Sequence, residues 1–309
     1  MKKLLLALVL LLAGAAGVLY FSPATLLASV QFIERQLAGV STRQIQVDGL
    51  DIVYYEGGPS DAPTILMLHG FGANRDNWLR FSRFLSGDYH IIALDLPGFG
   101  ESSKPAISYD VASQAERVHA FTKALGLDKV HLIGNSMGGH IAALYAARYP
   151  DEVASLALLD NAGVTSPHKS EMFTRIENGE ANPLVVRKPE DFDALLQFVF
   201  VSPPPLPAAL KQHFAEQSLA NRDHYDQIFA QLREHYVALE PELPKIQAPT
   251  LLLWGDQDRV LDVSSIEVMK PLLKNPSVVI MKQCGHAPMI ERPEETAQHY
   301  LNFLGARQG

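Results

Sequence analysis

Ser136 lies in the part of this sequence that best suits chemistry. The segment GNSMGG at 134–139 fits the pattern G-x-S-x-G through Gly134, Ser136 and Gly138. A short apolar run precedes the serine and apolar residues at helical spacing follow it, which predicts a strand that turns sharply into a helix. Glycines beside such a turn allow close backbone approach. We therefore predict that the turn presents the Ser136 hydroxyl as a nucleophile.

A serine hydroxyl is almost unionised at neutral pH, so it needs a base within hydrogen-bond reach and a carboxylate that orients the base. His286 follows the last apolar strand and is the predicted base. Asp258 is the predicted acid, because it projects furthest past the strand that ends in the segment WGDQD. Asp256 in the same turn is interpreted as a turn or capping residue. Asp160, which follows the preceding strand, ranks third as a candidate acid.

His140 is the nearest alternative base, one helical turn beyond Ser136. Its position in the chain is expected to point it away from the exposed side of the serine. The other histidines occupy helices, strands or the cap without the placement of His286, so we interpret them as structural or solvent-exposed.

The elements that must position these residues form an alternating pattern. Six apolar segments begin near residues 64, 90, 130, 153, 250 and 277, and each has polar residues just past its carboxyl end. Open parallel sheets place their sites outside these ends. Residues 45–58 alternate around Asp48-Gly49 and predict a hairpin. The pattern predicts an α/β fold with one mainly parallel sheet. After residue 72 it predicts a helix with Trp78, Phe81, Phe84 and Leu85 on one face.

The motifs HGFG, GNSMGG, WGDQD and GHAPMIERP, in this order within residues 45–305, resemble the α/β-hydrolase superfamily. Together with an apolar N-terminal segment, HGFGANRDNW, DLPGFGESS and GNSMGGHIAALYAARYP are similar to membrane-associated monoacylglycerol lipases and related bacterial lipases and esterases. In that superfamily nucleophile, acid and histidine follow one another in this chain order.

The resemblance implies an eight-stranded, mostly parallel sheet flanked by helices, with a helical cap insertion. It makes Ser136 the nucleophile, Asp258 the acid and His286 the base, and it builds the oxyanion hole from the backbone amides of Phe71 and Met137. It further implies hydrolysis of monoacylglycerols or medium-chain acyl esters through an acyl-enzyme. Such a reaction needs no metal or organic cofactor, because the triad itself supplies nucleophile, base and orienting acid.

Two other functions stay open. One is a C–C bond hydrolase of the same fold, and the other is a non-catalytic protein that binds lipids in an apolar pocket. The formal charge of −8, without a cluster of Lys or Arg, argues against nucleic acid as a partner. The single cysteine, Cys284, excludes an internal disulfide and is interpreted as a core residue.

The core is expected to comprise residues 43–164 and 246–309, and the cap residues 165–245. In the cap the strand-helix alternation stops and prolines cluster. Its large apolar residues are expected either to line an acyl-chain tunnel or to pack the cap onto the core. They are Met172, Phe173, Phe198, Phe200, Phe214 and Phe229.

Residues 1–22 are predicted to form a membrane anchor. Lys2 and Lys3 precede an uncharged apolar run to Phe21 that is long enough to cross a bilayer. The lysines predict a cytoplasmic N-terminus and a catalytic domain on the other side, which is periplasmic in a bacterium. A signal peptide cleaved near residues 13–16, and hence a secreted protein, is the alternative. Residues 23–42 are predicted to form a linker or amphipathic helix, with apolar positions up to Val40, that rests on the membrane or packs on the domain.

Overall fold

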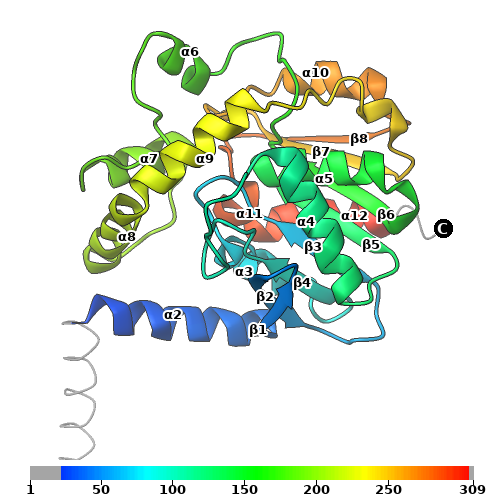
Figure 1. Ribbon diagram of the computed structural model, residues 1–309, viewed down its shortest axis with the longest axis horizontal. Coiled ribbons are helices and arrows are strands. Elements are labelled where there is room, and N and C mark those ends of the chain that lie inside the picture. The colour runs from blue at the N-terminus through cyan, green and yellow to red at the C-terminus, as the bar shows by residue number, and fades with distance from the viewer. Residues whose placement is uncertain (1–21, 306–309) are drawn as a thin grey trace, which may run out of the picture.

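The computed structural model describes residues 22–305 and contains one eight-stranded sheet. Figure 1 shows this sheet with its covering helices. The strand order is β1-β2-β4-β3-β5-β6-β7-β8. β1 and β2 form an antiparallel hairpin, β2 is antiparallel to β4, and all other neighbours are parallel. The predicted α/β fold is thereby confirmed. The strands are β1 (Val40–Val47), β2 (Leu50–Gly57), β3 (Thr64–Leu68), β4 (His90–Leu94), β5 (Val130–Asn135), β6 (Val153–Leu159), β7 (Thr250–Gly255) and β8 (Ser277–Met281).

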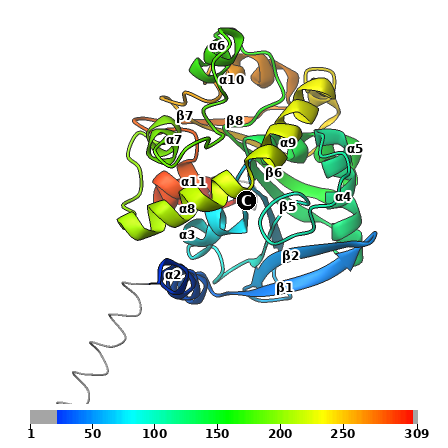
Figure 2. The same cartoon turned by 60° about the vertical axis from the view of Figure 1, so that its left-hand side comes forward.

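Helices cover both faces of the sheet, as Figure 2 shows for α4 and α5 on one side and α3 and α11 on the other. The central strand β3 is buried along its whole length, so its side chains alternate between the two layers rather than between core and water. One layer contains α4 (Val111–Ala124), α5 (Met137–Arg148) and α10 (Ser265–Met269). The other contains α3 (Leu79–Ser82), α11 (Pro288–Glu291) and α12 (Pro293–Gly305).

The N-terminal boundary differs from the sequence prediction. α2 (Pro23–Ala38) begins after Ser22, whose hydroxyl accepts the Thr25 N–H, and it ends at Gly39. Gly39 adopts φ 64° and its N–H bonds the carbonyls of the last helical turn. Val40 therefore starts β1, and its assignment to the helical stripe was wrong. The hairpin also begins earlier than expected and turns through Asp48 at φ 50° and Gly49 at φ 80°.

The helix expected after residue 72 is shorter than predicted. It consists of a 3-10 turn, η1 (Arg75–Trp78), followed by the single turn α3. Trp78, Phe81 and Leu85 are buried as expected, but Phe84 is 36% exposed. The helix ends at Ser82, so the helical spacing no longer determines where Phe84 points.

Four helices lie between β6 and β7 in the chain, over the carboxyl ends of the strands (Figure 1). They are α6 (Glu171–Glu177), α7 (Asp191–Val199), α8 (Ala208–Ala220) and α9 (Arg222–Glu234). All of them fall within the segment 165–245 assigned above to a cap. Short 3-10 turns complete the described elements: η2 (Pro150–Glu152), η3 (Leu243–Lys245) and η4 (Lys270–Leu272).

Within residues 22–305, no helix has both the length and the apolar character needed to cross a membrane. The anchor predicted for residues 1–22 lies, apart from Ser22, outside the described residues.

Candidate active site

Ser136 occupies a strained turn between β5 and α5. Its backbone has φ 57° and ψ −122°, outside the regions that L-residues usually adopt. Hydrogen bonds hold this conformation: the Ser136 N–H donates to Leu159 O at 3.0 Å, and the Ser136 carbonyl accepts from the N–H groups of His140 and Ala162, both at 3.1 Å. Within residues 134–139, the two residues before Ser136 belong to the predicted strand and the three after it belong to the predicted helix. The change of chain direction therefore occurs at Ser136 alone.

The glycines around Ser136 are required by the close approach of other backbone segments. A Cβ on Gly138 would lie 2.3 Å from Leu68 O, and one on Gly134 would lie 2.3 Å from Gly138 O. Neither contact is possible for a real Cβ without backbone movement. The G-x-S-x-G pattern therefore reflects packing of α5 against both β3 and β5.

Asp258 and His286 are hydrogen-bonded to each other. The His286 Nδ1 lies 2.8 Å from Asp258 Oδ2, and both side chains are almost completely buried. Asp258 Oδ1 accepts the N–H groups of Val260 at 2.7 Å and Leu261 at 3.0 Å. A carboxylate held in this way accepts the Nδ1–H and leaves Nε2 of the imidazole as its basic nitrogen.

Asn135 links the serine turn to the histidine loop, and sequence reasoning missed it. Its Nδ2 donates to His286 O at 3.0 Å and to Leu159 O at 3.2 Å. The N–H of His286 also donates to Val199 O at 2.8 Å. The only signal in the sequence was its position next to Ser136, which does not reveal a partner 151 positions away.

The loop that contains Phe71 packs directly on the serine. A Cβ added to Gly70 would lie 3.0 Å from the Ser136 Cβ. His69 holds this loop: its Nε2 accepts the Leu96 N–H at 3.0 Å, so its Nδ1 carries the proton and donates to Gly70 O at 2.8 Å. Burial lowers the pKa of His69, which favours this neutral form. The peptide groups of Phe71 and of Met137, the first residue of α5, thus belong to segments that meet at Ser136.

A buried ion pair supports the same loop. Asp95 is fully buried and accepts the N–H groups of Arg75 at 2.7 Å and Glu101 at 2.8 Å. The Arg75 guanidinium pairs with both the Asp95 and the Glu101 carboxylates. Two segments, one after β3 and one after β4, are thereby locked together beside Phe71.

Comparison with known proteins assigns this architecture. The α/β-hydrolase fold family matches residues 63–293. The chain belongs to this family. It is 40% identical over 261 residues to Lipase 1 of Psychrobacter immobilis, covering 82% of this chain and 81% of the lipase. It is 31% identical over 296 residues to monoacylglycerol lipase ABHD6 of Mus musculus, covering 92% of this chain and 88% of that protein.

A solved structure is more similar still. A bacterial membrane phospholipase A, described as a virulence factor, superposes with a TM-score of 0.92 at 67% identity, covering 99% of each chain. With these relatives, the chain is an ester-hydrolysing member of the α/β-hydrolase family, in the lipase and esterase class.

The alternative site residues of this hydrolase have separate roles. Asp256 accepts the Gln283 N–H at 2.7 Å and lies 3.5 Å from Lys282 Nζ, which agrees with its interpretation as a turn residue. His140 points to the cap, where its Nε2 lies 2.7 Å from Val237 O. Asp160 is different, because it lies beside Asp258 rather than apart from it.

One oxygen of Asp160, one oxygen of Asp258 and one ring nitrogen of His286 all lie within 4.8 Å of one another. Among the described residues this is the one His-carboxylate group compact enough to hold a cation. Asp258 and His286 already bond each other, so Asp160 is a second buried carboxyl beside that pair.

The cap helices bring aromatic rings to the Phe71 loop. The Phe71 ring lies 5.7 Å from the rings of both Tyr225 and Phe229 on α9, and 6.1 Å from the ring of Phe99. Phe229 is therefore the predicted cap residue that reaches the loop beside Ser136.

The other cap residues mostly pack within the cap or onto the core. Met172 and Phe198 are buried together with Val260, whereas Phe214 stacks on Phe192 at 6.0 Å. Phe173 is 38% exposed. Phe200 is buried in the core layer of α12.

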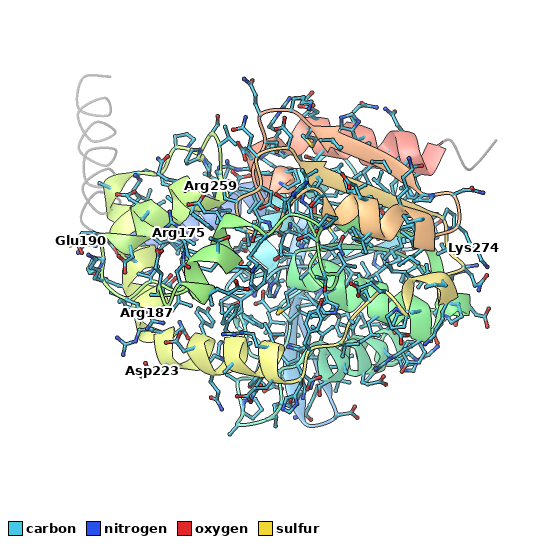
Figure 3. All side chains as sticks on the ribbon, turned by 90° about the horizontal axis from the view of Figure 1, so that it is seen from above. Arg175, Arg187, Glu190, Asp223, Arg259 and Lys274 are labelled. Atoms are coloured by element: carbon cyan, nitrogen blue, oxygen red, sulfur yellow. The ribbon has the colours of Figure 1, made fainter. Side chains whose placement is uncertain are left out.

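A cavity of about 440 Å³ lies between the cap and the loop that carries Asp258. Glu171 and Arg259 line it together with Phe198, whose ring lies 4.6 Å from the Arg259 guanidinium. Arg175 and Arg259, which project from neighbouring segments in Figure 3, both bond Glu171, Arg259 in a bidentate manner. The hydrogen bond from Arg259 and that from Arg175 lower the pKa of Glu171 to about 2. The Arg175 contact lies within α6, whereas the two hydrogen bonds from Arg259 tie α6 to the Asp258 loop.

Proposed function

We propose that this hydrolase cleaves lipid esters by a serine mechanism in which Ser136 is the nucleophile, His286 the base and Asp258 the orienting acid. The observation that carries the proposal is the 2.8 Å hydrogen bond between His286 Nδ1 and Asp258 Oδ2, which Asn135 connects to the strained Ser136 turn.

In the proposed reaction, the Ser136 hydroxyl attacks the ester carbonyl while His286 Nε2 takes its proton. The backbone N–H groups of Phe71 and Met137 stabilise the oxyanion. His286 then returns the proton to the leaving alcohol. Water, activated by the same imidazole, hydrolyses the acyl-enzyme and frees Ser136.

The proposed substrates are monoacylglycerols or medium-chain acyl esters. The aromatic rings of Phe71, Phe99, Tyr225 and Phe229 support an apolar acyl chain beside the serine, and the named relatives include a monoacylglycerol lipase. A second candidate is the acyl ester of a phospholipid, because the relative that is 67% identical is a membrane phospholipase A.

A fluorophosphonate probe tests the mechanism. We expect it to label Ser136 in the wild type and not in Ser136→Ala, which also loses ester hydrolysis. Labelling that persists in Ser136→Ala contradicts the assignment. A silent lipid-binding protein would leave both the probe and a nitrophenyl ester unchanged.

A substrate panel tests the ester class. Monoacylglycerols of graded chain length, nitrophenyl esters, lysophospholipids and diacyl phospholipids are compared by kcat/KM, with a ring-cleavage diketone for the C–C bond hydrolase reading. We expect the highest kcat/KM with a lipid ester. A higher kcat/KM with the diketone refutes the ester proposal.

We further propose that residues 1–22 anchor the enzyme in the membrane, with the catalytic domain on the non-cytoplasmic side. The uncharged run from Leu4 to Phe21 and the preceding lysines support this placement. Protease accessibility of the catalytic domain in intact spheroplasts, with the mass of the mature N-terminus, distinguishes an anchored chain from a secreted one.

A further inference from the structure

One carboxyl oxygen of Asp160 is buried and has no hydrogen-bond partner in the structure. The residue directly follows β6 with φ 44° and is fully buried. Its Oδ1 accepts the Gly255 N–H at 2.9 Å, whereas its Oδ2 is buried without a hydrogen-bond partner. Burying a charged carboxylate oxygen without a hydrogen-bond donor costs free energy. We therefore expect this oxygen either to carry a proton or to accept a hydrogen bond.

The side chains of the proposed acid and base lie close to Asp160. One carboxyl oxygen of Asp160, one carboxyl oxygen of Asp258 and one ring nitrogen of His286 lie within 4.8 Å of one another. The other titratable groups that face Asp160 are Cys284 and Glu291, and neither supplies a positive charge. Among the described ion pairs none joins Asp160 to a Lys or Arg. Two buried carboxylates this close do not both ionise readily.

The hydrogen bonds decide which of the two carboxyls carries the proton. Asp258 accepts two backbone N–H groups besides the imidazole, so both of its oxygens already have donors. Asp160 accepts only one N–H. Burial raises the pKa of Asp160 well above its ordinary value, and the charge of Asp258 raises it further.

We propose that Asp160 is a positioning residue of this site, which stays protonated and donates its Oδ2–H to the Asp258 carboxylate. The inference rests on the proposed function, in which Asp258 orients His286. The added hydrogen bond fixes the Asp258 carboxylate against the imidazole. Because Asp160 is neutral, it does so without a second negative charge that would hold a proton on His286.

Two substitutions test this role. In Asp160→Ala the donor is lost, and we expect kcat to fall about tenfold with little change in KM. In Asp160→Asn the amide keeps both a donor for Asp258 and an acceptor for the Gly255 N–H, so it is expected to rescue most of kcat. Unchanged kcat in Asp160→Ala, or no rescue in a folded Asp160→Asn, overturns the proposal.

The pH profile separates a neutral from a charged Asp160. We expect the acid limb of kcat/KM to coincide in wild type and Asp160→Asn. If Asp160 were ionised, its removal would take a negative charge from beside the imidazole and move the acid limb down by about one pH unit or more. Asp256→Asn, at the same sheet edge, is the matched control and should leave both kcat and the acid limb in place.

Infrared difference spectroscopy reads the proton directly. At neutral pH we expect the carbonyl band of a protonated carboxyl in wild type and its absence in Asp160→Asn, and a missing band in wild type refutes the proposal. Fluorophosphonate labelling of wild-type Ser136 keeps the two hypotheses apart. If the label fails, the serine mechanism is wrong; if it succeeds and the acid limb moves, only the role of Asp160 is wrong.

Discussion

At the residue scale, the function of His286 depends on a single oriented hydrogen bond. Asp258 accepts from Nδ1, and its other oxygen is held by the Val260 and Leu261 N–H groups. Asp258→Asn would place an amide next to this ring and favour the wrong tautomer. We expect kcat to fall by about 10³- to 10⁴-fold with the fold intact. Ester hydrolysis, with circular dichroism as the check on folding, measures this; a variant within tenfold of wild type would contradict the role of Asp258.

Asn135 is expected to matter for both activity and stability. Its amide bonds the carbonyls of His286 and Leu159, so Asn135→Ala leaves two buried acceptors without this donor. We expect a loss of about 1–3 kcal/mol in the free energy of unfolding and a lower kcat. Urea unfolding and kcat measure the two effects. Asn302→Ala, on the exposed side of α12, is the matched control and should change neither.

Residue types and their order were enough to predict the pairing of Asp258 with His286, which a 2.8 Å hydrogen bond now joins, and the sharp turn at Ser136 between β5 and α5. Asn135, Arg75 and Asp95 could not be predicted, because their roles consist of contacts with distant segments. Asp160 was underrated for a related reason. Its place after β6 was visible, but its distance from Asp258 depends on how the neighbouring strands pair.

At the element scale, α5 can approach β3 only because residue 138 has no side chain. Alanine is better than glycine in a helix by about 1 kcal/mol, so propensity alone favours Gly138→Ala. The added Cβ would lie 2.3 Å from Leu68 O and 2.4 Å from His69 O, and these are backbone atoms. We expect the clash to dominate and to destabilise the fold by about 2 kcal/mol or more, with loss of fluorophosphonate labelling.

Gly87→Ala is the matched control for this substitution. A Cβ there meets nothing within 4 Å, and the backbone is not left-handed. We expect a change in unfolding free energy within about 0.5 kcal/mol. If thermal unfolding shows equal effects for the two variants, the close approach of α5 and β3 does not limit stability.

His140 joins α5 to the end of the cap and makes stability depend on pH. Burial lowers the pKa of His140 from 6.5 to about 4. The folded state therefore binds this proton more weakly than the unfolded state. The contribution of neutral His140 to the free energy of unfolding is fully present above pH 6.5. It decreases by roughly 3 kcal/mol as the pH falls towards 4.

Unfolding free energies across this pH range test the effect. His140→Gln keeps a donor for Val237 O but does not titrate, so its stability should fall less between pH 6.5 and 4. His235→Gln removes an exposed histidine and should keep the wild-type slope. Coincident slopes for wild type and His140→Gln would show that the buried imidazole does not control this loss.

At the scale of the whole molecule, periodicity predicted the α/β sheet and its order of motifs well, because central strands read as continuous apolar runs. It placed the end of α2 wrongly, since Gly39 ends the helix while the apolar spacing continues to Val40. The cap was the least predictable part. Its helices pack through contacts among themselves, so that Phe173 is exposed although its neighbour Met172 is buried.

α2 lies against the domain beside β1 and α8, as Figures 1 and 2 show, and polar contacts hold it there. Gln31 donates to Asp76 at 2.6 Å, and Glu34 pairs with Arg80 at 3.1 Å and Arg83 at 2.8 Å. Three large apolar side chains of the helix are instead exposed to solvent: Phe32, Ile33 and Leu37 are 55–57% exposed, whereas Leu26, Leu27 and Val30 are partly buried. Around these three residues, polar side chains of α2 face the protein and large apolar ones face solvent, the reverse of an ordinary surface helix.

This reversal predicts that α2 contributes to membrane binding apart from residues 1–21. In protein that lacks those residues, we expect Phe32→Ser, Ile33→Ser and Leu37→Ser together to lower partition into zwitterionic phospholipid vesicles by about tenfold or more, because each large side chain loses apolar area that the interface would bury. Since the full chain already has a net charge of −8, and removing residues 1–21 takes away Lys2 and Lys3, the binding should be hydrophobic and change little with salt.

Vesicle sedimentation measures the partition. Tyr236→Ser with Ile280→Ser, which removes apolar side chains that are 49% and 45% exposed elsewhere on the surface, is the matched control and should bind as wild type does. Equal losses in both variants would mean that general surface hydrophobicity drives binding. Full partition of the α2 variant would mean that the helix only packs on the domain. A loss of binding only in the α2 variant would show that α2 lies in the membrane interface. The position of α2 would then determine how the cap and the sheet edge that carries Ser136 are oriented relative to the lipid that supplies the substrate.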